Sequence, residues 1–384
     1  MSSDLELAVY DLSPLPEGVE PTKNPNTKFS RNVCAILDIN PSEVDINKFK
    51  DGETDPKIEK SVRDKKIFVF QSYIKPHGER KYELELFLDA VTFGGSNKNG
   101  VVVVFPYAFG SRGERRARSR QAVPTLVFAR SLGAFKAETL LTGGIHAENI
   151  GTVYNGQDVY FEHLEFEIVA ANYILRNYHE NGSVAVVSPD AGGLKRVRRI
   201  EKIITSGRVR ELEGVNLEVV TGSADKVREK ADEIESSHLL DSVEGYDVVI
   251  VDDIGDTLGS LYDAAKNCRA NGAKSVRALL YHATLGEGYE EKMRKIFDEK
   301  LVDEIVFGNT VPIKRFAKDH QKVRILPFEP LFAEAVKRIH ENKSMSELFT
   351  YEGIMEVYDR ARHLYKGDPK YVKIGRLKLP TLDS

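Results

Sequence analysis

The sequence predicts an α/β fold in which mainly parallel sheets are flanked by helices on both faces. Short apolar runs rich in β-branched residues recur along the chain, at 67–70, 101–105, 184–187, 217–220, 248–251, 276–281 and 304–307. Segments with apolar residues at helical spacing lie between these runs, as at 82–91, 126–132 and 261–265. Continuous apolar strands that alternate with helices are typical of parallel sheets, which bind ligands at the carboxyl ends of their strands.

The length and the number of strands predict two domains and a tail. The chain has 384 residues, 41% of them hydrophobic, which is enough for two cores of ordinary size. A polar turn at 152–165 is the candidate boundary, so we expect an N-terminal domain over 1–160 and a C-terminal domain over 161–349. Beyond about residue 348 the pattern changes to one helix and then a short basic coil, which predicts a tail over 350–384.

The composition argues against several classes of protein. Acidic residues outnumber basic ones by 59 to 55, so the net charge of −4 gives no indication of a nucleic-acid partner. Two cysteines, Cys34 and Cys268, cannot form a disulfide framework or a zinc site made of several thiolates. The first twenty residues lack a basic stretch followed by an apolar run, and no segment has the roughly 20 apolar residues that span a bilayer. We therefore expect a cytoplasmic protein without a membrane partner.

The segment VVIVDDIGDTLGSL at 248–261 carries the strongest functional signal. A buried strand ends in Asp252 and Asp253, and the loop that follows opens a helix. That loop contains Asp256, Thr257, Leu258, Gly259 and Ser260. Backbone N–H groups at such a helix start bind phosphate, whereas two adjacent carboxylates need sugar hydroxyls or a divalent cation. Phosphate and diol together indicate a ribose phosphate; the alternative is a buried strand followed by an ordinary capped helix.

Five other segments place polar residues beside predicted strands or in loops. They are NKFKDGE with Phe49, Asp51, Gly52 and Glu53; the arginine-rich SRGERRARSR with Arg112, Gly113 and Glu114; LLTGGIHAENI with His146; VVSPDAGGLKR with Asp190; and SADKVREK with Lys226 and Arg228. The arginine-rich run is a generic anion trap that could also bind RNA or another protein. The absence of tryptophan and of interleaved aromatic residues there weakens the RNA interpretation.

Together these motifs resemble the ribose-phosphate pyrophosphokinase family, in consistent order over roughly residues 45–349. The resemblance implies two phosphoribosyltransferase-like domains and the following roles. Lys226 and Arg228 would be catalytic, with Arg228 also contacting the ribose phosphate. Phe49, Asp51, Gly52 and Glu53 would recognise adenine, and Arg112, Gly113, Glu114 and His146 would hold ATP. Asp252, Asp253 and the loop from Asp256 to Ser260 would bind the ribose phosphate, while His146 and Asp190 would orient Mg²⁺.

The resemblance also implies a reaction and an assembly. The anomeric hydroxyl of ribose 5-phosphate would attack the β-phosphorus of Mg-ATP, giving 5-phosphoribosyl 1-pyrophosphate and AMP for nucleotide biosynthesis. Cationic side chains suit this chemistry, because phosphoryl transfer depends on positioning and charge stabilisation rather than on covalent catalysis. The family forms homodimers and homohexamers, so Asp51 to Glu53 could complete a neighbour's ATP site.

Several positions depart from the family pattern. Gly113 stands where a glutamine usually follows the ATP-gripping arginine, Leu258 replaces a small residue, and Gly143 and Gly144 replace acidic residues before His146. A larger side chain at 258 could point away or could reshape the pocket for a bulkier acceptor such as ADP-ribose. A catalytically silent regulatory homologue and a phosphoribosyltransferase are further alternatives. The presence of Lys226, Arg228, His146 and Asp190 argues against the silent homologue.

Overall fold

A computed structural model describes residues 6–12, 28–95, 100–147, 149–224 and 242–377 of the chain. It divides into two compact units. Unit 1 takes in residues 1–164, 310–312 and 329–345, and unit 2 takes in 165–309, 313–328 and 346–384. The chain passes from one unit to the other more than once. The domain limits expected at residues 160 and 349 stay predictions. No helix in the described ranges is long and apolar enough to cross a membrane.

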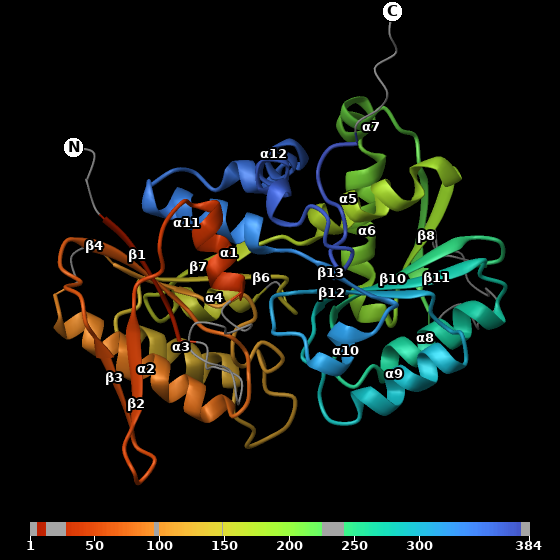
Figure 1. Ribbon diagram of the computed structural model, residues 1–384. Helices are drawn as coiled ribbons and strands as arrows, with labels where there is room; N and C mark the ends of the chain where they lie inside the picture. The colour runs from red at the N-terminus through yellow and green to blue at the C-terminus, as the bar shows by residue number, and fades with distance from the viewer. Residues whose placement is uncertain (1–5, 13–27, 96–99, 148, 225–241, 378–384) are drawn as a thin grey trace, which may run out of the picture. The chain divides into compact units, whose positions relative to one another are not determined.

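Unit 1 is built on a parallel sheet of five strands in the order β1-β4-β5-β6-β7. The strands are β1 (Glu6–Asp11), β4 (Lys65–Phe70), β5 (Val101–Val104), β6 (Thr139–Gly143) and β7 (Tyr160–Leu164). Helices α2 (His77–Phe93) and α3 (Pro124–Ala134) lie on one face, and α1 (Lys28–Ile36) and α11 (Glu329–His340) lie on the other (Figure 1). The short helix α4 (Ile150–Asn155) precedes β7. All four residues of β5 are buried, as its run of valines predicts.

The segment at 152–165, expected to be a polar boundary turn, contains the edge strand β7. Tyr160 in this strand is 69% exposed, whereas Leu164 is buried. An edge strand has only one neighbour and leaves part of its side chains in water, so its sequence lacks the apolar run of a central strand. The polar composition that suggested a turn therefore comes from an edge position in the sheet.

An antiparallel hairpin projects from unit 1 (Figure 1). It consists of β2 (Val44–Lys48) and β3 (Thr54–Ile58), which packs against α2. The tip contains Phe49, whose side chain is 56% exposed. A large aromatic side chain at the exposed tip of a hairpin is available to contact another molecule.

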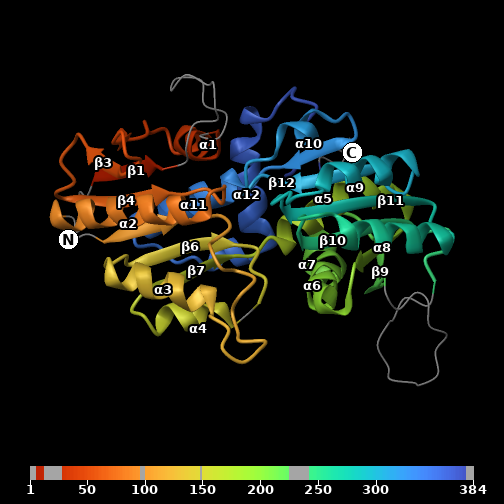
Figure 2. The same ribbon diagram turned by 90° about the horizontal axis from the view of Figure 1, so that it is seen from below.

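Unit 2 is built on a parallel sheet of six strands in the order β13-β12-β11-β10-β8-β9. The strands are β8 (Ser183–Ser188), β9 (Glu218–Ser223), β10 (Asp247–Ile254), β11 (Ser275–His282), β12 (Glu304–Gly308) and β13 (Val323–Leu326). Helices α5 (Glu167–Tyr178) and α6 (Leu194–Thr205) cover one face, and α8 (Gly259–Ala270) and α9 (Tyr289–Asp298) cover the other (Figure 2). Shorter helices are α7 (Gly207–Glu213) and α10 (Arg315–Asp319). The two helix-flanked parallel sheets confirm the predicted α/β class.

The C-terminal segment packs onto unit 2 through a buried asparagine on α5. After the predicted helix, present as α12 (Tyr351–Ala361), a short 3₁₀ helix at Arg362–Leu364 leads into a coil that runs past Gly375. Asn172 Nδ2 donates to the hydroxyl of Tyr351 at 2.7 Å and to the carbonyl of Gly375 at 3.1 Å. Its Oδ1 accepts from the N–H of Gly375 at 3.1 Å, and the Tyr351 hydroxyl donates to Glu213 at 3.0 Å. One amide side chain therefore joins α5, α12 and the final coil.

We expect Asn172→Ala to destabilise unit 2. The change removes three hydrogen bonds in a buried position, which costs about 2–3 kcal/mol and lowers the Tm by about 5–10 °C. The chain has no tryptophan, so circular dichroism at the helical band is the suitable signal for a melting curve. Asn47→Ala, in the exposed hairpin, is the matched control and should leave the Tm within about 2 °C. If the two variants have the same Tm, the hydrogen bonds of Asn172 do not stabilise the C-terminal segment.

Candidate functional site

The predicted ribose-phosphate residues lie at the carboxyl edge of the unit 2 sheet, where the parallel strands end. Strands β8 and β10 are neighbours, so the segment after Ser188 and the residues that end β10 emerge side by side. Asp252 and Asp253 are the sixth and seventh residues of β10, and Asp190 is the second residue after the end of β8. The topology therefore brings the three predicted carboxylates to one edge.

Arg196 on α6 links the two adjacent carboxylates of β10. Its Nη1 lies 3.5 Å from Asp252 Oδ1, and its Nη2 lies 3.3 Å from Asp253 Oδ1. Only 12% of the Arg196 side chain is exposed, and its guanidinium also lies over the ring of Tyr281, 5.8 Å from the centroid. A fork of N–H donors can contact two carboxylates at once, which a single ammonium group does less well. The sequence places the basic segment 195–199 beside polyphosphate, and only the fold shows that its member Arg196 turns inward to the two carboxylates.

The carboxylate pair holds a proton more tightly than isolated aspartates do. The pKa of Asp252 is raised to about 8: burial contributes most, the hydrogen bond and negative charge of Asp253 act in the same direction, and Arg196 acts in the opposite direction. The N–H of Asp253 also donates to Asp252 Oδ1 at 2.9 Å. Without a ligand, Asp252 is therefore protonated over much of the neutral range. A ligand that needs the Asp252 carboxylate must displace this proton.

The loop after β10 turns its backbone toward the start of α8. The N–H of Gly286 donates to Asp256 Oδ1 at 3.0 Å, and the N–H of Leu285 donates to the carbonyl of Gly255 at 2.9 Å. These bonds anchor the loop to the segment that follows β11. Helix α8 begins at Gly259 and continues for twelve residues, so its first N–H groups lie where the sequence predicts an anion, and that anion site stays a prediction.

Leu258 points into the core rather than into the loop. Its backbone is left-handed, with φ of 63°, and its side chain is 3% exposed among apolar residues of β10, β11 and α8. Left-handed backbone costs a leucine about 1–2 kcal/mol, whereas burying its side chain contributes about 1.5–3 kcal/mol. Burial therefore offsets the strain. This departure from the family pattern fills the core and does not widen the loop on its solvent side.

Asp190 caps the turn that leads into α6. Its Oδ1 accepts from the N–H groups of Gly192 at 2.9 Å and Gly193 at 3.3 Å, and the residue is exposed. A Cβ at Gly193 would lie 2.1 Å from Ser188 Oγ and 3.2 Å from Arg196 Nη1, so only glycine permits this close approach. The short turn thus sets the position of α6 and of Arg196.

The arginine-rich segment of unit 1 follows β5. Gly113 lies against Pro124 at the start of α3, where a Cβ would come within 2.6 Å of the proline Cδ. Its N–H donates to the carbonyl of Gly110 at 2.7 Å. The glutamine of the family pattern would not fit this packing, which explains Gly113 in steric terms. Arg112 beside it is exposed, whereas Glu114 is 12% exposed and lies 3.6 Å from Arg115 Nε.

His146 is exposed in the loop after β6. Gly144 in this loop has φ of +55° and donates its N–H to the carbonyl of Leu164 at 3.0 Å. A left-handed turn at this point favours glycine over an acidic residue. Among the residues that the structure describes, no three His, Cys, Asp or Glu side chains converge so that they could hold a metal ion. His146 and Asp190 as Mg²⁺ residues stay a prediction.

The predicted adenine loop is the tip of the β2–β3 hairpin. Phe49 donates its N–H to the carbonyl of Glu53 at 2.8 Å, and Gly52 donates to the carbonyl of Phe49 at 2.9 Å. The N–H of Glu53 also donates to Asp51 Oδ1 at 3.1 Å. The structure thus brings all four predicted residues into one closed turn. Lys226 and Arg228 lie outside the described residues, so their catalytic role stays a prediction.

Known proteins resemble the chain over both units. The model for the N-terminal domain of ribose phosphate pyrophosphokinase matches residues 22–135, and the model for the phosphoribosyl synthetase-associated domain matches residues 223–350. Ribose-phosphate pyrophosphokinase of Helicobacter hepaticus is 34% identical over 325 residues, which are 84% of this chain and 96% of that protein. The same enzyme of Campylobacter jejuni is 31% identical, again over 84% of this chain and 96% of its own length.

A solved structure shares the fold. Phosphoribosylpyrophosphate synthetase of Mycobacterium smegmatis superimposes with a TM-score of 0.68 at 23% identity, over 88% of this chain and 99% of that one. Its likeness confirms the predicted fold of two phosphoribosyltransferase-like halves. The two family models together cover residues 22–135 and 223–350, and the relatives cover 84% of the chain. The chain therefore belongs to the ribose-phosphate pyrophosphokinase family.

Proposed function

We propose that the protein transfers the β,γ-pyrophosphoryl group of ATP to the anomeric hydroxyl of ribose 5-phosphate. The products are 5-phosphoribosyl 1-pyrophosphate and AMP. In this reaction a bond forms between the anomeric oxygen and the β-phosphorus, the bond from that phosphorus to the oxygen of AMP breaks, and the hydroxyl proton is released. The observation that carries the proposal is the carboxylate pair of Asp252 and Asp253 beside the start of α8, in a chain of this family.

The carboxyl edge of unit 2 offers both parts of a ribose phosphate their chemical complement. The N–H groups at the start of α8, with the hydroxyls of Thr257 and Ser260, suit a 5-phosphate. Asp252 suits the ring hydroxyls, because a carboxylate accepts two hydrogen bonds from a diol. We propose that Arg196 keeps this carboxylate in place through its own contact with Asp253. Lys226 and Arg228 would stabilise charge on the transferring group.

We propose, from the family resemblance, that Asp190 and His146 orient the Mg²⁺ of Mg-ATP, directly or through water. Mg²⁺ prefers oxygen ligands in octahedral geometry, keeps several waters and is bound through one or two protein groups plus substrate phosphates. When bound, the ion would neutralise phosphate charge. Arg112 and Glu114 would then hold ATP, and the hairpin tip would receive adenine.

We propose ribose 5-phosphate as the acceptor, because the main observation that favoured a bulkier acceptor no longer supports it. Leu258 suggested a reshaped pocket for ADP-ribose, but its side chain is buried in the core. We also propose that the protein works as a homodimer or homohexamer, in which the turn from Asp51 to Glu53 completes a neighbour's ATP site. Its exposed position on a projecting hairpin supports this arrangement.

The acceptor is tested by supplying Mg-ATP with ribose 5-phosphate or with ADP-ribose and measuring AMP. We expect AMP release with ribose 5-phosphate at a kcat/KM at least about tenfold above that with ADP-ribose, a difference of about 1.4 kcal/mol in transition-state binding. AMP with ADP-ribose alone would reverse the acceptor assignment. No AMP with either acceptor would favour the silent homologue or a phosphoribosyltransferase.

Lys226→Ala should lower kcat by about two orders of magnitude or more with little change in KM. The reason is that its contact with the transferring group is expected mainly in the transition state. Lys266→Ala, which removes an exposed lysine on α8, is the control and should keep normal turnover. Near-normal kcat in the Lys226 variant would remove this residue from the catalytic role.

Binding of ribose 5-phosphate should release a proton near neutral pH. Because the pKa of Asp252 is raised to about 8 without ligand, the group is protonated below that pH and must ionise to accept the diol. Affinity should therefore increase as pH rises from about 6.5 to about 8.5. Calorimetry in buffers of different ionisation enthalpy measures the proton directly. Asp252→Asn should abolish the release and Asp263→Asn, on the exposed side of α8, should keep it; equal proton release in both variants would contradict the assignment.

A further inference from the structure

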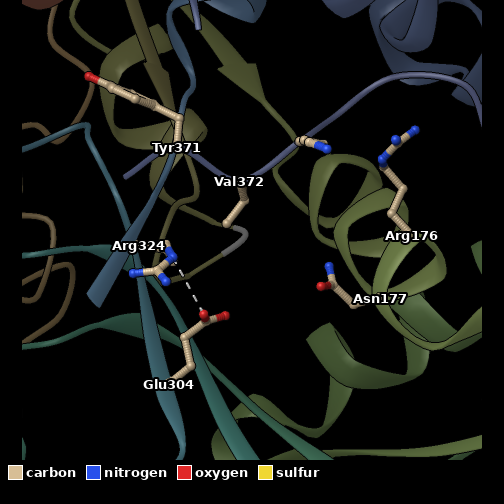
Figure 3. Close-up of a pocket in the computed structure, with 7 residues that line it drawn as sticks. Arg176, Asn177, Glu304, Arg324, Tyr371 and Val372 are labelled. Atoms are coloured by element: carbon tan, nitrogen blue, oxygen red, sulfur yellow. Dashed lines mark ion pairs between the residues drawn. The ribbon is translucent and has the colours of Figure 1, made fainter. Parts of the chain in front are cut away.

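Unit 2 contains a cavity of about 330 Å³ at the edge of the sheet opposite to the candidate site. One wall comes from Arg176 and Asn177 near the end of α5, and the other from Glu304 on β12 and Arg324 on β13 (Figure 3). Residues 371–373 of the C-terminal coil complete the lining. We call residues 370–376 the C-terminal strap. It pairs with β13 through the N–H of Ile325, which donates to the carbonyl of Lys370 at 2.7 Å.

The cavity is distinct from the ribose-phosphate site. Asp252 is paired with Leu280, and Leu280 with Phe307, across the parallel sheet. Glu304 precedes Phe307 by three residues and begins β12. At about 3.3 Å per residue, the two sites are roughly 10 Å apart along the strand direction alone, at opposite ends of the strands.

Positive charge dominates the lining. Arg176, Arg324 and Lys373 face one carboxylate, Glu304. Glu304 Oε2 lies 3.7 Å from Arg324 Nε, and Glu304 Oε1 accepts from the hydroxyl of Tyr173 at 3.3 Å. A single carboxylate offsets one of the three cations, so the cavity keeps an excess positive charge that attracts anions.

Backbone carbonyls hold the two arginines in place without neutralising them. Arg176 Nη1 donates to the carbonyls of Gly375 at 3.0 Å and Arg376 at 2.9 Å. Arg324 Nη1 donates to the carbonyls of Gln321 at 2.7 Å and Val323 at 3.2 Å. Each guanidinium has five N–H donors, so these bonds fix the side chain and leave donors for a ligand. Burial and then the charge of Arg362 lower the pKa of Arg176, whereas Glu213, Tyr351 and Asp359 act in the opposite direction.

A neighbouring arginine extends the positive surface. Arg277 on β11 lies over the ring of Tyr178, 5.2 Å from its centroid, and its Nη1 contacts Asn177 Oδ1 at 3.5 Å. Because Arg277 is paired with Glu304 in the sheet, it points to the same face as the cavity lining. The amide of Asn177 and the carboxylate of Glu304 add hydrogen-bonding groups beside the cations. These suit the hydroxyl groups that accompany a phosphate in a small metabolite.

We propose that this cavity binds the phosphate group of a small phosphorylated molecule and that the bound anion fastens the C-terminal strap to α5 and β13. Planar guanidinium groups match phosphate oxygens in pairs, and Lys373 supplies a cation from the strap itself. The volume lies at the lower end of the range for ligand pockets, about 300–1,000 Å³, which favours a compact ligand. The matched family domain ends at residue 350, so the strap lies beyond the part of the chain that it covers.

Calorimetry with inorganic phosphate tests the site. We expect Arg324→Gln and Lys373→Gln each to lower the number of bound phosphates by one per chain, or to raise the dissociation constant of that phosphate by about tenfold. Arg315→Gln, which removes an arginine that is 94% exposed on α10, is the control for charge and should not change binding. The double variant Thr257→Ala, Ser260→Ala distinguishes the two phosphate sites. It should lose the phosphate at the start of α8 and keep the phosphate at the C-terminal strap.

Limited trypsin digestion adds a readout that involves the strap directly. Phosphate should slow cleavage after Lys370, Lys373 and Arg376 by about threefold or more in the wild type, because a stabilised segment opens less often. The protection should disappear in Arg324→Gln, while AMP release at saturating substrates stays normal. Lys373 is exposed, so its variant tests the site even if Arg324→Gln fails to fold. Unchanged phosphate stoichiometry and unchanged protection in both variants would overturn the proposal, whatever the result of the AMP assay.

Discussion

The adjacent carboxylates at the end of β10 impose the constraint on which the site depends. Asp252 and Asp253 are consecutive, partly buried and of like charge, so ionisation of both is unfavourable without a counter-charge. Arg196 supplies part of that counter-charge from α6, although the pKa of Asp252 stays raised. The approach of α6 depends in turn on Gly193, which has no Cβ to meet Ser188. Breaking a buried charge pair of this kind costs about 3–5 kcal/mol. The glycine, the arginine and the two aspartates therefore fix the geometry of the carboxyl edge together.

Much of the fold follows from the sequence because its central strands are apolar on both faces. The predicted runs at 101–105, 184–187 and 248–251 become β5, β8 and β10, which are buried. The edge strands β1, β7 and β13 and the hairpin strands β2 and β3 were missed. The residues of β2, β3 and β7 are half-exposed and lack an apolar run, whereas β1 and β13 are mostly buried. A long apolar run indicates a central strand that is buried on both faces, so it identifies the middle of a sheet better than its edges.

The candidate site was predictable by residue type but not by side-chain direction. The motifs place carboxylates after strands, and the parallel topology brings Asp190, Asp252 and Asp253 together. The inward turn of Arg196 and the burial of Leu258 depend on tertiary packing and on a left-handed backbone at one residue. Neither can be read from spacing. The closeness of Gly113 to Pro124 likewise explains a departure from the family pattern only once α3 is in place.

The two edges of the unit 2 sheet combine charge in opposite ways. At the carboxyl edge, acidic residues predominate next to helix N–H groups, which suits a sugar diol attached to a phosphate. At the amino edge, guanidinium groups held by backbone carbonyls predominate, and the final segment of the chain closes the lining. A single parallel sheet thus separates the two proposed anion sites by its own strand length.

The most direct test of the central claim is a crystal structure of the protein with ribose 5-phosphate. The account predicts the sugar hydroxyls within hydrogen-bonding distance of Asp252, the phosphate on the N–H groups from Thr257 to Ser260, and Arg196 still in contact with both carboxylates. A sugar bound away from the carboxyl edge of β10, or a phosphate that does not contact the start of α8, would contradict it.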